Sequence, residues 1–287
     1  MQQLSLAWPD GIPLSVTKSL LPFRSKLSLH TYLHIHLHAR IAANNKPPGE
    51  KKGVFSRKKM LNLVASLELL IQKLTLSPQQ STWSAYYDEA GQRPDYLQSK
   101  KEIIGQWLSA EKYITTAADL GANDGAFSRL LAKKNIRTIA ADFDPFCINT
   151  LYGSLKKETI INIQPVIIDL ANPSPAIGVN NEERSSFTSR LKVDMIIALA
   201  LIHHLAIGKN IPFDKIAALF AGCCQKLIIE FVPKTDEKIQ LMLAGRKDVF
   251  DDYNKASFEH YFSQHFRIKQ KQEIASSGRT LYLMEKI

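Results

Sequence analysis

The chain has 287 residues, of which 45% are hydrophobic, and its formal net charge is +10 at pH 7. This length suits one α/β domain with an accessory segment, or two small domains. The first ten residues lack the basic start and apolar core of a signal peptide, and no apolar run approaches the length of a bilayer span. Three cysteines give neither a disulfide framework nor a zinc spacing. We therefore expect a cytoplasmic protein with no membrane partner.

Positive charge is concentrated in the first part of the chain. Residues 1–110 hold 14 Lys and Arg against 7 Asp and Glu, whereas residues 111–287 hold 23 against 20. Such an excess could attract an acidic partner such as RNA, but a solvated basic face is the simpler explanation. Nucleic acid is therefore an alternative partner that the charge does not favour.

Residues 1–110 are predicted to form a mainly helical accessory or cap segment. The apolar pattern indicates one or two helices over Leu14–Ala43, and a polar run with two prolines predicts a mobile loop near 44–58. Amphipathic spacing predicts two further helices, at Met60–Leu74 and Tyr96–Leu108.

From residue 114 onward, short apolar runs alternate with helical patterns, which is typical of βαβ units and a parallel sheet. The predicted strands are Thr115–Leu120, Thr138–Asp142, Pro165–Asp169, Val193–Leu201, Lys226–Phe231, Phe266–Gln272 and Arg279–Met284. The last two flank a Ser-Ser-Gly turn, so we expect them to form an antiparallel hairpin. Residues 111–287 are therefore predicted to form one α/β domain.

The clearest ligand-binding pattern follows the first predicted strand. Asp119 lies near the end of that strand, and the loop Gly121-Ala122-Asn123-Asp124-Gly125 leads into a helix. Glycines let the backbone approach a ligand closely, and the helix N-terminus lies at the end of the loop. Asp142 ends the neighbouring strand, where a carboxylate can accept both hydroxyls of an adenosine ribose. These residues predict a nucleotide-type cofactor site.

Two cofactor classes fit this pattern, the nicotinamide dinucleotides and S-adenosylmethionine. The dinucleotide fingerprint requires a glycine where this chain has Asn123. Asp119 would repel a pyrophosphate, whereas its charge suits the ammonium group of a methionine moiety. A C-terminal hairpin is also not expected of a simple dinucleotide fold. The residues therefore favour S-adenosylmethionine.

Over residues 113–287 the sequence resembles the class I S-adenosylmethionine-dependent methyltransferases. This resemblance implies a Rossmann-like, mostly parallel seven-stranded sheet with a C-terminal antiparallel hairpin. It implies that the glycine-containing loop cradles the methionine end of the cofactor, with the ribose and the adenine amine further along the sheet edge. The implied cofactor-binding residues are Asp119, Gly121, Asn123, Gly125, Asp142 (ribose) and Asp169 (adenine amine). Asn123 departs from the family, in which glycine is commoner, and Asp169 could instead cap the turn that follows it.

Three stretches resemble a bacterial group of methyltransferase-like proteins that includes a nodulation-associated member. They are Asp169–Gly178, Ala198–Leu205 and Ile229–Lys234. Members of this group carry a longer N-terminal region. We therefore expect this chain to be a fragment of a longer protein or to work with a partner chain.

Candidate catalytic and acceptor-covering residues lie outside the loop. His203 and His204 follow the fourth predicted strand, where an imidazole could remove a proton from the methyl acceptor. Alternation along an extended strand favours His203 as the one that faces the cofactor, and packing is the simpler alternative for both. Trp83, Tyr87 and Tyr96 could cover the cofactor or the acceptor, or could form an ordinary hydrophobic seam.

Two other polar patterns have structural explanations. Glu230 is expected to pair with Lys234, four residues further on. His30, His34 and His38 share one helix face, but no Cys, Asp or Glu is close by in sequence, so we expect no metal site.

The sequence thus predicts an enzyme that transfers a methyl group from S-adenosylmethionine to an unidentified acceptor. A small molecule or glycan-type substrate, enclosed by the N-terminal segment, is the favoured acceptor. The alternatives are an RNA methyltransferase that uses the basic N-terminal segment, and a non-catalytic methyltransferase-like partner subunit.

Overall fold

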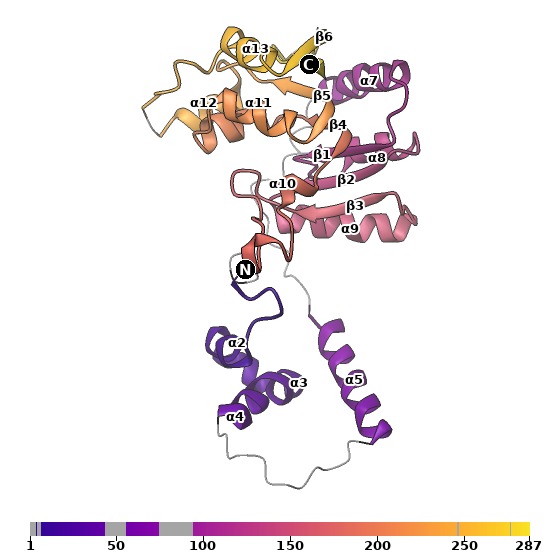
Figure 1. Ribbon diagram of the computed structural model, residues 1–287, viewed down its shortest axis with the longest axis vertical. Helices are drawn as coiled ribbons and strands as arrows, with labels where there is room; N and C mark the ends of the chain where they lie inside the picture. The colour runs from indigo at the N-terminus through magenta and orange to yellow at the C-terminus, as the bar shows by residue number, and fades with distance from the viewer. Residues whose placement is uncertain (1–3, 5–6, 44–55, 75–93, 246, 276) are drawn as a thin grey trace. The chain divides into compact units, whose positions relative to one another are not determined.

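The computed structural model describes residues 4, 7–43, 56–74, 94–245, 247–275 and 277–287. The chain divides into two compact units, Met1–Ser77 and Pro78–Ile287, which are drawn in Figure 1 and described separately below. This division lies about 30 residues before the expected domain boundary at residue 110. Among the described residues, no helix is long and apolar enough to cross a membrane.

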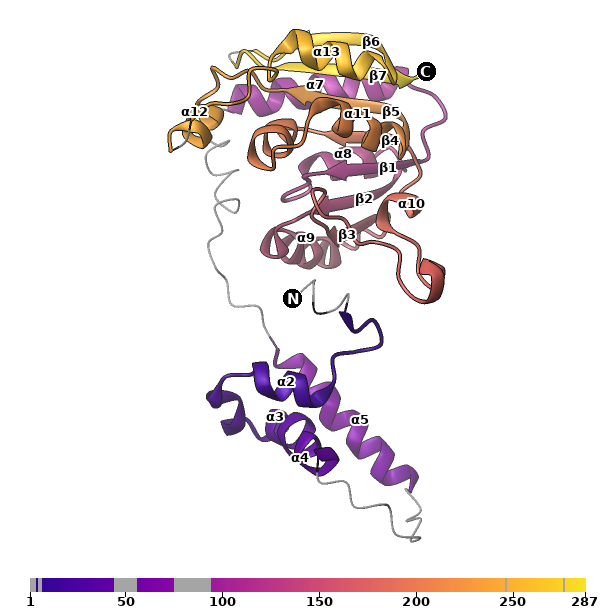
Figure 2. The ribbon, with the colours of Figure 1, turned by 60° about the vertical axis from the view of Figure 1, so that its left-hand side comes forward.

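The first unit consists of short helical elements. They are α2 (Leu14–Leu20), η1 (Phe23–Leu27), α3 (Leu29–Thr31), η2 (Tyr32–Leu37), α4 (His38–Ala43) and α5 (Arg57–Gln72). Elements α3, η2 and α4 follow one another directly, and α5 lies beside α3 in Figure 2. Helix α5 begins at Arg57, within the expected loop 44–58, because the Ser56 side chain accepts a hydrogen bond from Lys59 N–H. The rest of that loop, 44–55, lies outside the described residues.

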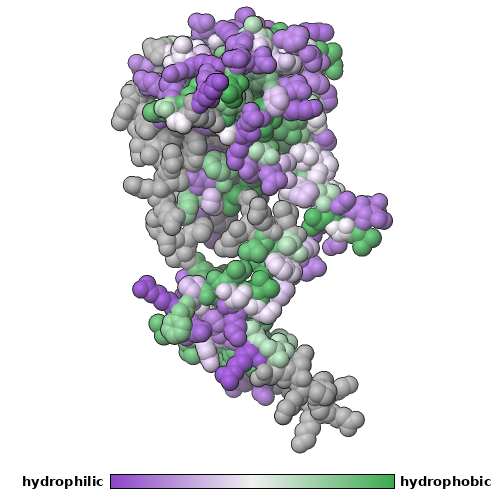
Figure 3. Space-filling view, turned by 90° about the vertical axis from the view of Figure 1, so that its left-hand side faces the viewer, coloured by the Kyte–Doolittle hydropathy of each residue, from purple (hydrophilic) through white to green (hydrophobic). Residues whose placement is uncertain are grey.

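Few side chains are buried in the first unit. His36 and Ala39 are buried, whereas Phe23, Leu27 and Leu29 are mostly exposed. In the lower part of Figure 3, which shows the first unit, hydrophobic as well as hydrophilic side chains lie on the surface. This unit therefore has only a small core of its own.

The second unit is built around a seven-stranded sheet. Its strands are β1 (Thr116–Leu120), β2 (Arg137–Asp142), β3 (Ile163–Ile167), β4 (Val193–Ala198), β5 (Cys224–Phe231), β6 (Phe266–Glu273) and β7 (Thr280–Lys286). The strand order is β3-β2-β1-β4-β5-β7-β6. Strands β1 to β5 are parallel, and β7 pairs antiparallel with both β5 and β6. This confirms the mostly parallel sheet with a C-terminal antiparallel hairpin.

Helices cover both faces of this sheet (Figures 1 and 2). The helices are α7 (Pro94–Ala110), α8 (Ala126–Ala132), α9 (Pro145–Glu158), α10 (Phe187–Arg190), α11 (Phe213–Ala221), α12 (Glu237–Leu243) and α13 (Lys255–Ser263), with short turns η3 (Val179–Asn181) and η4 (His204–Gly208). Because side chains alternate along a strand, Met195 and Ile197 of β4 pack with α7 and α8, whereas Ile196 and Ala198 pack with α11 and α13. The continuous apolar runs of the central strands therefore result from burial on both faces.

Helix α7 belongs to the second unit, although it was expected in the accessory segment. Its residues Ile103, Ile104 and Trp107 are buried against Leu131 of α8 and Ile228 of β5. An amphipathic pattern identifies such a helix but does not reveal which sheet covers its apolar face.

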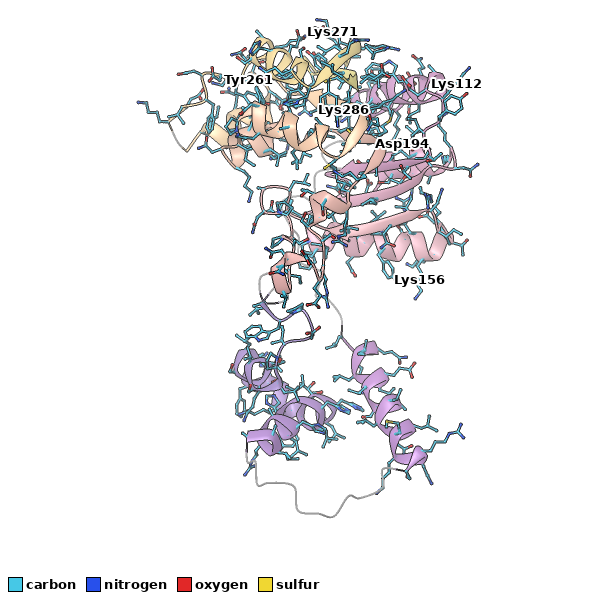
Figure 4. The ribbon with its side chains drawn as sticks, in the orientation of Figure 1. Lys112, Lys156, Asp194, Tyr261, Lys271 and Lys286 are labelled. Carbon is cyan, nitrogen blue, oxygen red and sulfur yellow. The ribbon has the colours of Figure 1, made fainter. Side chains whose placement is uncertain are left out.

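Asp194, near the start of β4, connects this strand to the start of β1. Its carboxylate, labelled in Figure 4, accepts hydrogen bonds from the backbone N–H groups of Thr115 and Thr116 at 2.8 and 2.9 Å. The hydroxyls of both threonines also donate to it, so the entry to β1 is fixed against β4.

Candidate functional site

A cavity of about 440 Å³ lies at the carboxyl ends of the parallel strands. This volume is in the range of small-molecule sites, and ligands of open α/β sheets bind at this edge. The cavity is lined by Lys100, Asp119, Gly121, Ala122, Asn123, Phe127, Ala141, Asp142, Phe143, Ile168, Asp169, Leu170, Leu199, Ala200, Leu201, His204, Leu205, Gly208, Lys209 and Met242. Five of the six predicted cofactor residues are among them.

The loop after β1 brings its backbone to the cavity wall. Gly121 has φ +82°, and the N–H groups of Gly121 and Ala122 donate to Ala141 O at 2.8 and 3.0 Å. Asn123 has φ +48°, a left-handed conformation that asparagine tolerates better than most residues. The departure from glycine at this position is therefore compatible with the loop geometry.

The carboxylate of Asp142 is held at the end of β2. Its Oδ2 accepts the Asn123 N–H and its Oδ1 accepts the Asp144 N–H, both at 2.9 Å. Burial raises the pKa of Asp142, and these two backbone hydrogen bonds oppose that rise. Each oxygen keeps a further lone pair, so the group can still accept two hydroxyl donors.

Asp119 lies deeper in the cavity, one residue before the end of β1. It is 3% exposed, and the Ser128 hydroxyl donates to its Oδ2 at 2.6 Å. Burial raises the pKa of Asp119 to about 6, although the hydrogen bond from Ser128 opposes the shift. The group is thus mostly ionised at neutral pH and can attract a cation.

Asp169 lines the cavity beyond the end of β3. Its Oδ1 accepts the Ala171 N–H at 2.9 Å, and the ammonium group of Lys209 lies 3.6 Å from its Oδ2. The hydrogen bond is the turn cap that was considered as an alternative, and the cavity position is compatible with an adenine contact as well. The two explanations therefore do not exclude each other.

Gly125 is not part of the cavity wall. It has φ +79° at the start of α8, and a Cβ placed there would lie 2.6 Å from Leu151 Cδ1. In the structure this glycine has a packing role, since it lets the loop pack closely against α9.

The end of β4 differs from the prediction and changes the geometry of the two histidines. The strand ends at Ala198, Ala200 takes φ +48°, and residues 202–208 are helical, so side chains do not alternate through His203 and His204. His204 lines the cavity, whereas His203 is 1% exposed and does not. The selection of His203 as the group facing the cofactor was therefore wrong.

Both imidazoles are poor proton acceptors in this environment. Their ring centroids are 4.0 Å apart. Burial lowers the pKa of His204 to about 4 and that of His203 well below its usual value, and Arg279 lowers both further. His204 is consequently neutral at physiological pH.

A buried ionic cluster is centred on Glu230 of β5, and it meets the cavity through Lys100 and Ala200. Glu230 is 0% exposed and accepts hydrogen bonds from Tyr96 Oη (2.5 Å), Lys100 Nζ (2.7 Å), Arg279 Nη1 (3.3 Å) and the Ala200 N–H (2.9 Å). Burial alone would raise the pKa of Glu230, but the cations Lys100 and Arg279 hold it at about 2.

Two sequence-based expectations are corrected by this cluster. Lys234 pairs with Asp248 instead of Glu230, at 2.9 Å. Tyr96 is buried and does not line the cavity, so it supports the wall through Lys100 instead of covering a ligand. Trp83 and Tyr87 lie outside the described residues.

Several residues of the cavity wall were not identified from the sequence. Lys100 and Phe127 come from helices that precede and follow β1, and Phe143 directly follows Asp142. The position of Phe143, directly after the acid predicted to bind the ribose, could have indicated it. No local signal marks Lys100, because its partner Glu230 is 130 residues away.

The described residues contain no group of three or more His, Cys, Asp or Glu side chains placed to hold a metal ion. The histidines of the first unit make other contacts. His34 Nε2 lies 2.8 Å from Ser66 Oγ, and His36 Nε2 lies 2.8 Å from Ser25 Oγ.

The strand order, the reversed seventh strand and the ligand-binding edge together define the class I methyltransferase fold. No family model matches the chain. The chain is similar to nodulation protein NoeA of Rhizobium meliloti (strain 1021), with 33% identity over 285 residues. The match covers 96% of this chain and 60% of NoeA, so the chain spans about three-fifths of the length of this relative.

Two solved structures are similar to this chain at low sequence identity. A candidate O-methyltransferase of Nostoc punctiforme PCC 73102 matches with a TM-score of 0.50 and 15% identity, over 74% of this chain and 62% of that one. Magnesium protoporphyrin IX methyltransferase (ChlM) of Synechocystis PCC 6803, solved with bound S-adenosylhomocysteine (SAH), has a TM-score of 0.48 and 17% identity. That match covers 67% of this chain and 84% of ChlM.

Proposed function

We propose that this protein binds S-adenosylmethionine and transfers its methyl group to a small-molecule or glycan-type acceptor. The observation that carries the proposal is the arrangement of Asp142, Gly121 and Asp119 along one wall of a single cavity. It offers a fixed carboxylate for a ribose diol, a side-chain-free backbone segment, and a second carboxylate for an ammonium group.

The donors and acceptors of the cavity fit this cofactor better than a dinucleotide. Three carboxylates line it, Asp119, Asp142 and Asp169, and they would repel a pyrophosphate. A methionine ammonium, a ribose and an adenine amine each present hydrogen-bond donors that carboxylates accept. When bound, the sulfonium of S-adenosylmethionine supplies an electrophilic methyl group.

The residues beyond β4 are candidates for the acceptor side of the cavity. Leu201, Leu205 and Met242 give this part of the wall an apolar surface, and His204 adds one polar group. A neutral imidazole with a pKa of about 4 can accept a hydrogen bond from an acceptor hydroxyl, but it is a weak base. Positioning the acceptor and excluding water would therefore be the main contributions of these residues.

The size of the cavity supports a small acceptor group. A nucleoside cofactor would occupy much of the 440 Å³, which leaves room for one sugar hydroxyl or a comparable group beside it. The positive charge lies mostly in residues 1–110, so an RNA acceptor would depend on that segment.

Calorimetry with the full chain tests the proposal. SAH and S-adenosylmethionine should bind with micromolar affinity, whereas NAD should not compete with either. Tight NAD binding without binding of either nucleoside would contradict the proposal. Binding of SAH without methyl transfer to any small glycan, amine or RNA would support the alternative of a non-catalytic subunit.

A further inference from the structure

A second, smaller cavity lies apart from the proposed cofactor site. Its volume is about 280 Å³, close to the lower end of the range of small-molecule sites, and it shares no lining residue with the larger cavity. Four aromatic residues line it, together with four aliphatic residues, one asparagine and two aspartates. We call it the aromatic pocket, after the rings of Phe213, Phe250, Tyr253 and Tyr261.

Two of these rings and both aspartates come from one tight turn before α13. The Tyr253 N–H donates to Phe250 O at 3.0 Å, so residues 250–253 form a hydrogen-bonded turn. Phe250 and Tyr253 stand at its two ends, and Asp251 and Asp252 occupy its exposed tip. Tyr253 is held in place, because its hydroxyl donates to Val232 O at 2.8 Å. The turn therefore presents aromatic rings and carboxylates to the same pocket.

The other two rings come from helices α11 and α13. Phe213 begins α11, and its ring centroid lies 5.3 Å from that of Tyr253. Both of these residues are buried and belong to the core of the second unit. Tyr261, labelled in Figure 4, is a half-buried residue of α13. Because much of the aromatic wall is fixed by core packing, a ligand would not have to order it on binding.

The charged groups of the aromatic pocket are all negative. No Lys or Arg lines it, and the Asp251 and Asp252 side chains have no hydrogen-bond or ion-pair partner among the described residues. The faces of aromatic rings also carry partial negative charge and attract cations. The rings inside the pocket and the carboxylates at its opening therefore favour a ligand of positive charge.

We propose that the aromatic pocket binds a small organic cation, an alkylated ammonium group whose carbon atoms contact the rings while Asp251 and Asp252 balance its charge. An anion would be repelled by both carboxylates. An uncharged polar ligand would gain little from them, because water offers exposed carboxylates equivalent hydrogen bonds. This binding site is separate from the proposed cofactor site and does not depend on methyl transfer.

A pair of ligands of equal shape tests the proposal. Nuclear magnetic resonance titrations of the full chain would compare choline with 3,3-dimethyl-1-butanol, which has a carbon atom in place of the charged nitrogen. Choline should bind at least about tenfold more tightly. Replacing Asp251 and Asp252 together by Asn should remove most of this preference. Tyr261→Leu should weaken choline binding by about threefold or more, whereas Tyr261→Phe, which keeps the ring, should not.

The matched control removes two exposed acids from α7, outside the pocket. Asp95→Asn combined with Glu102→Gln changes the net charge equally and should leave choline binding unchanged. The proposal is wrong if neither ligand binds, if both bind equally, or if the control weakens choline binding as much as the pocket variant does. SAH affinity should be the same in all these variants, so a failure of the proposed function would be seen separately.

Discussion

The carboxylate of Glu230 accepts a hydrogen bond from the backbone N–H of Ala200 at 2.9 Å, and Ala200 has φ +48°. A left-handed conformation costs a non-glycine residue about 1–2 kcal/mol, so it needs support from its surroundings. Here the support comes from a fully buried charge on the neighbouring strand. The same carboxylate thus contacts both Lys100 and the turn that leads to His204, and both contribute to the cavity wall.

We predict that Glu230→Gln destabilises the protein strongly. The substitution keeps the shape but leaves Lys100 and Arg279 without their shared anion, which should lower the free energy of unfolding by about 3–5 kcal/mol. Urea unfolding followed by circular dichroism measures this. Glu285→Gln is the control, because Glu285 pairs with Lys269 at the surface and its loss should have little effect on the free energy of unfolding. Equal effects of the two substitutions would show that the buried cluster contributes little to the stability of the protein.

Asp142→Ala should weaken SAH binding by about 1–3 kcal/mol, because two ribose hydroxyls would lose a charged acceptor. Calorimetry gives the affinity directly. Asp251→Ala is a suitable control, since Asp251 is exposed and does not line the cavity. Unchanged SAH affinity in the Asp142 variant would move the ribose site elsewhere.

Gly121 and Gly125 should respond differently to alanine. At Gly121 the new Cβ would lie 3.6 Å from Leu201 Cδ1, so there is space, and the cost is mainly the strain of φ +82°. At Gly125 it would lie 2.6 Å from Leu151 Cδ1, inside a packed core. We expect Gly125→Ala to lower the thermal midpoint more than Gly121→Ala, and Gly121→Ala to weaken SAH binding more. If the order of the binding effects is reversed, the assignment of Gly125 to packing is incorrect.

The sequence allowed the strands of the sheet to be placed to within about three residues, since apolar runs and their spacing depend on local chemistry. Asp119, Gly121, Asn123 and Asp142, which the sequence predicts as cofactor residues, line the cavity. They could be singled out together because the loop and the acid lie close to each other along the chain. The errors have a different origin. The left-handed turn at Ala200 is stabilised by a hydrogen bond to Glu230, and no pattern around residues 198–204 reveals that contact.

The boundary between the units was also misplaced because it depends on contacts between residues far apart in the sequence. The apolar face of α7 was recognised, but its partners include Ile228 and Leu281, more than 100 residues further on. Long-range packing of this kind decides which unit a helix joins, and periodicity carries no information about it.

The raised pKa of Asp119 should be visible in the pH dependence of the free energy of unfolding. Because burial raises its folded-state pKa to about 6, above the unfolded value of about 3.9, the folded form binds more protons between these pH values. Its contribution to stability therefore falls as the pH rises through this window, by about 3 kcal/mol in total. Asp119→Asn should remove that part of the decrease, as urea titrations at pH 4, 5, 6 and 7 would show. If the Asp119→Asn variant has the same pH profile as the unmodified protein, Asp119 is not the group whose pKa is raised.

The last prediction concerns the two histidines. Burial and Arg279 lower the pKa of His204 to about 4, so its imidazole should stay neutral from about pH 5 upward, whereas an unperturbed histidine titrates near 6.5. Nuclear magnetic resonance of ring-labelled histidines, assigned with His203→Gln and His204→Gln, would follow both groups between pH 4 and 8. Addition of SAH should shift the His204 signals more than those of His203, because His204 alone lines the cavity.

A His204 that titrates near pH 6.5 would show that the ring faces water in solution, and the proposed contact with the acceptor would then lose its basis. If the His203 signals respond to SAH as strongly as those of His204, the helical turn after Ala200 must open when the ligand binds. His260 lies on α13, beside the exposed Gln264 and outside the cavity wall. Its signals therefore provide an internal reference for the response to SAH.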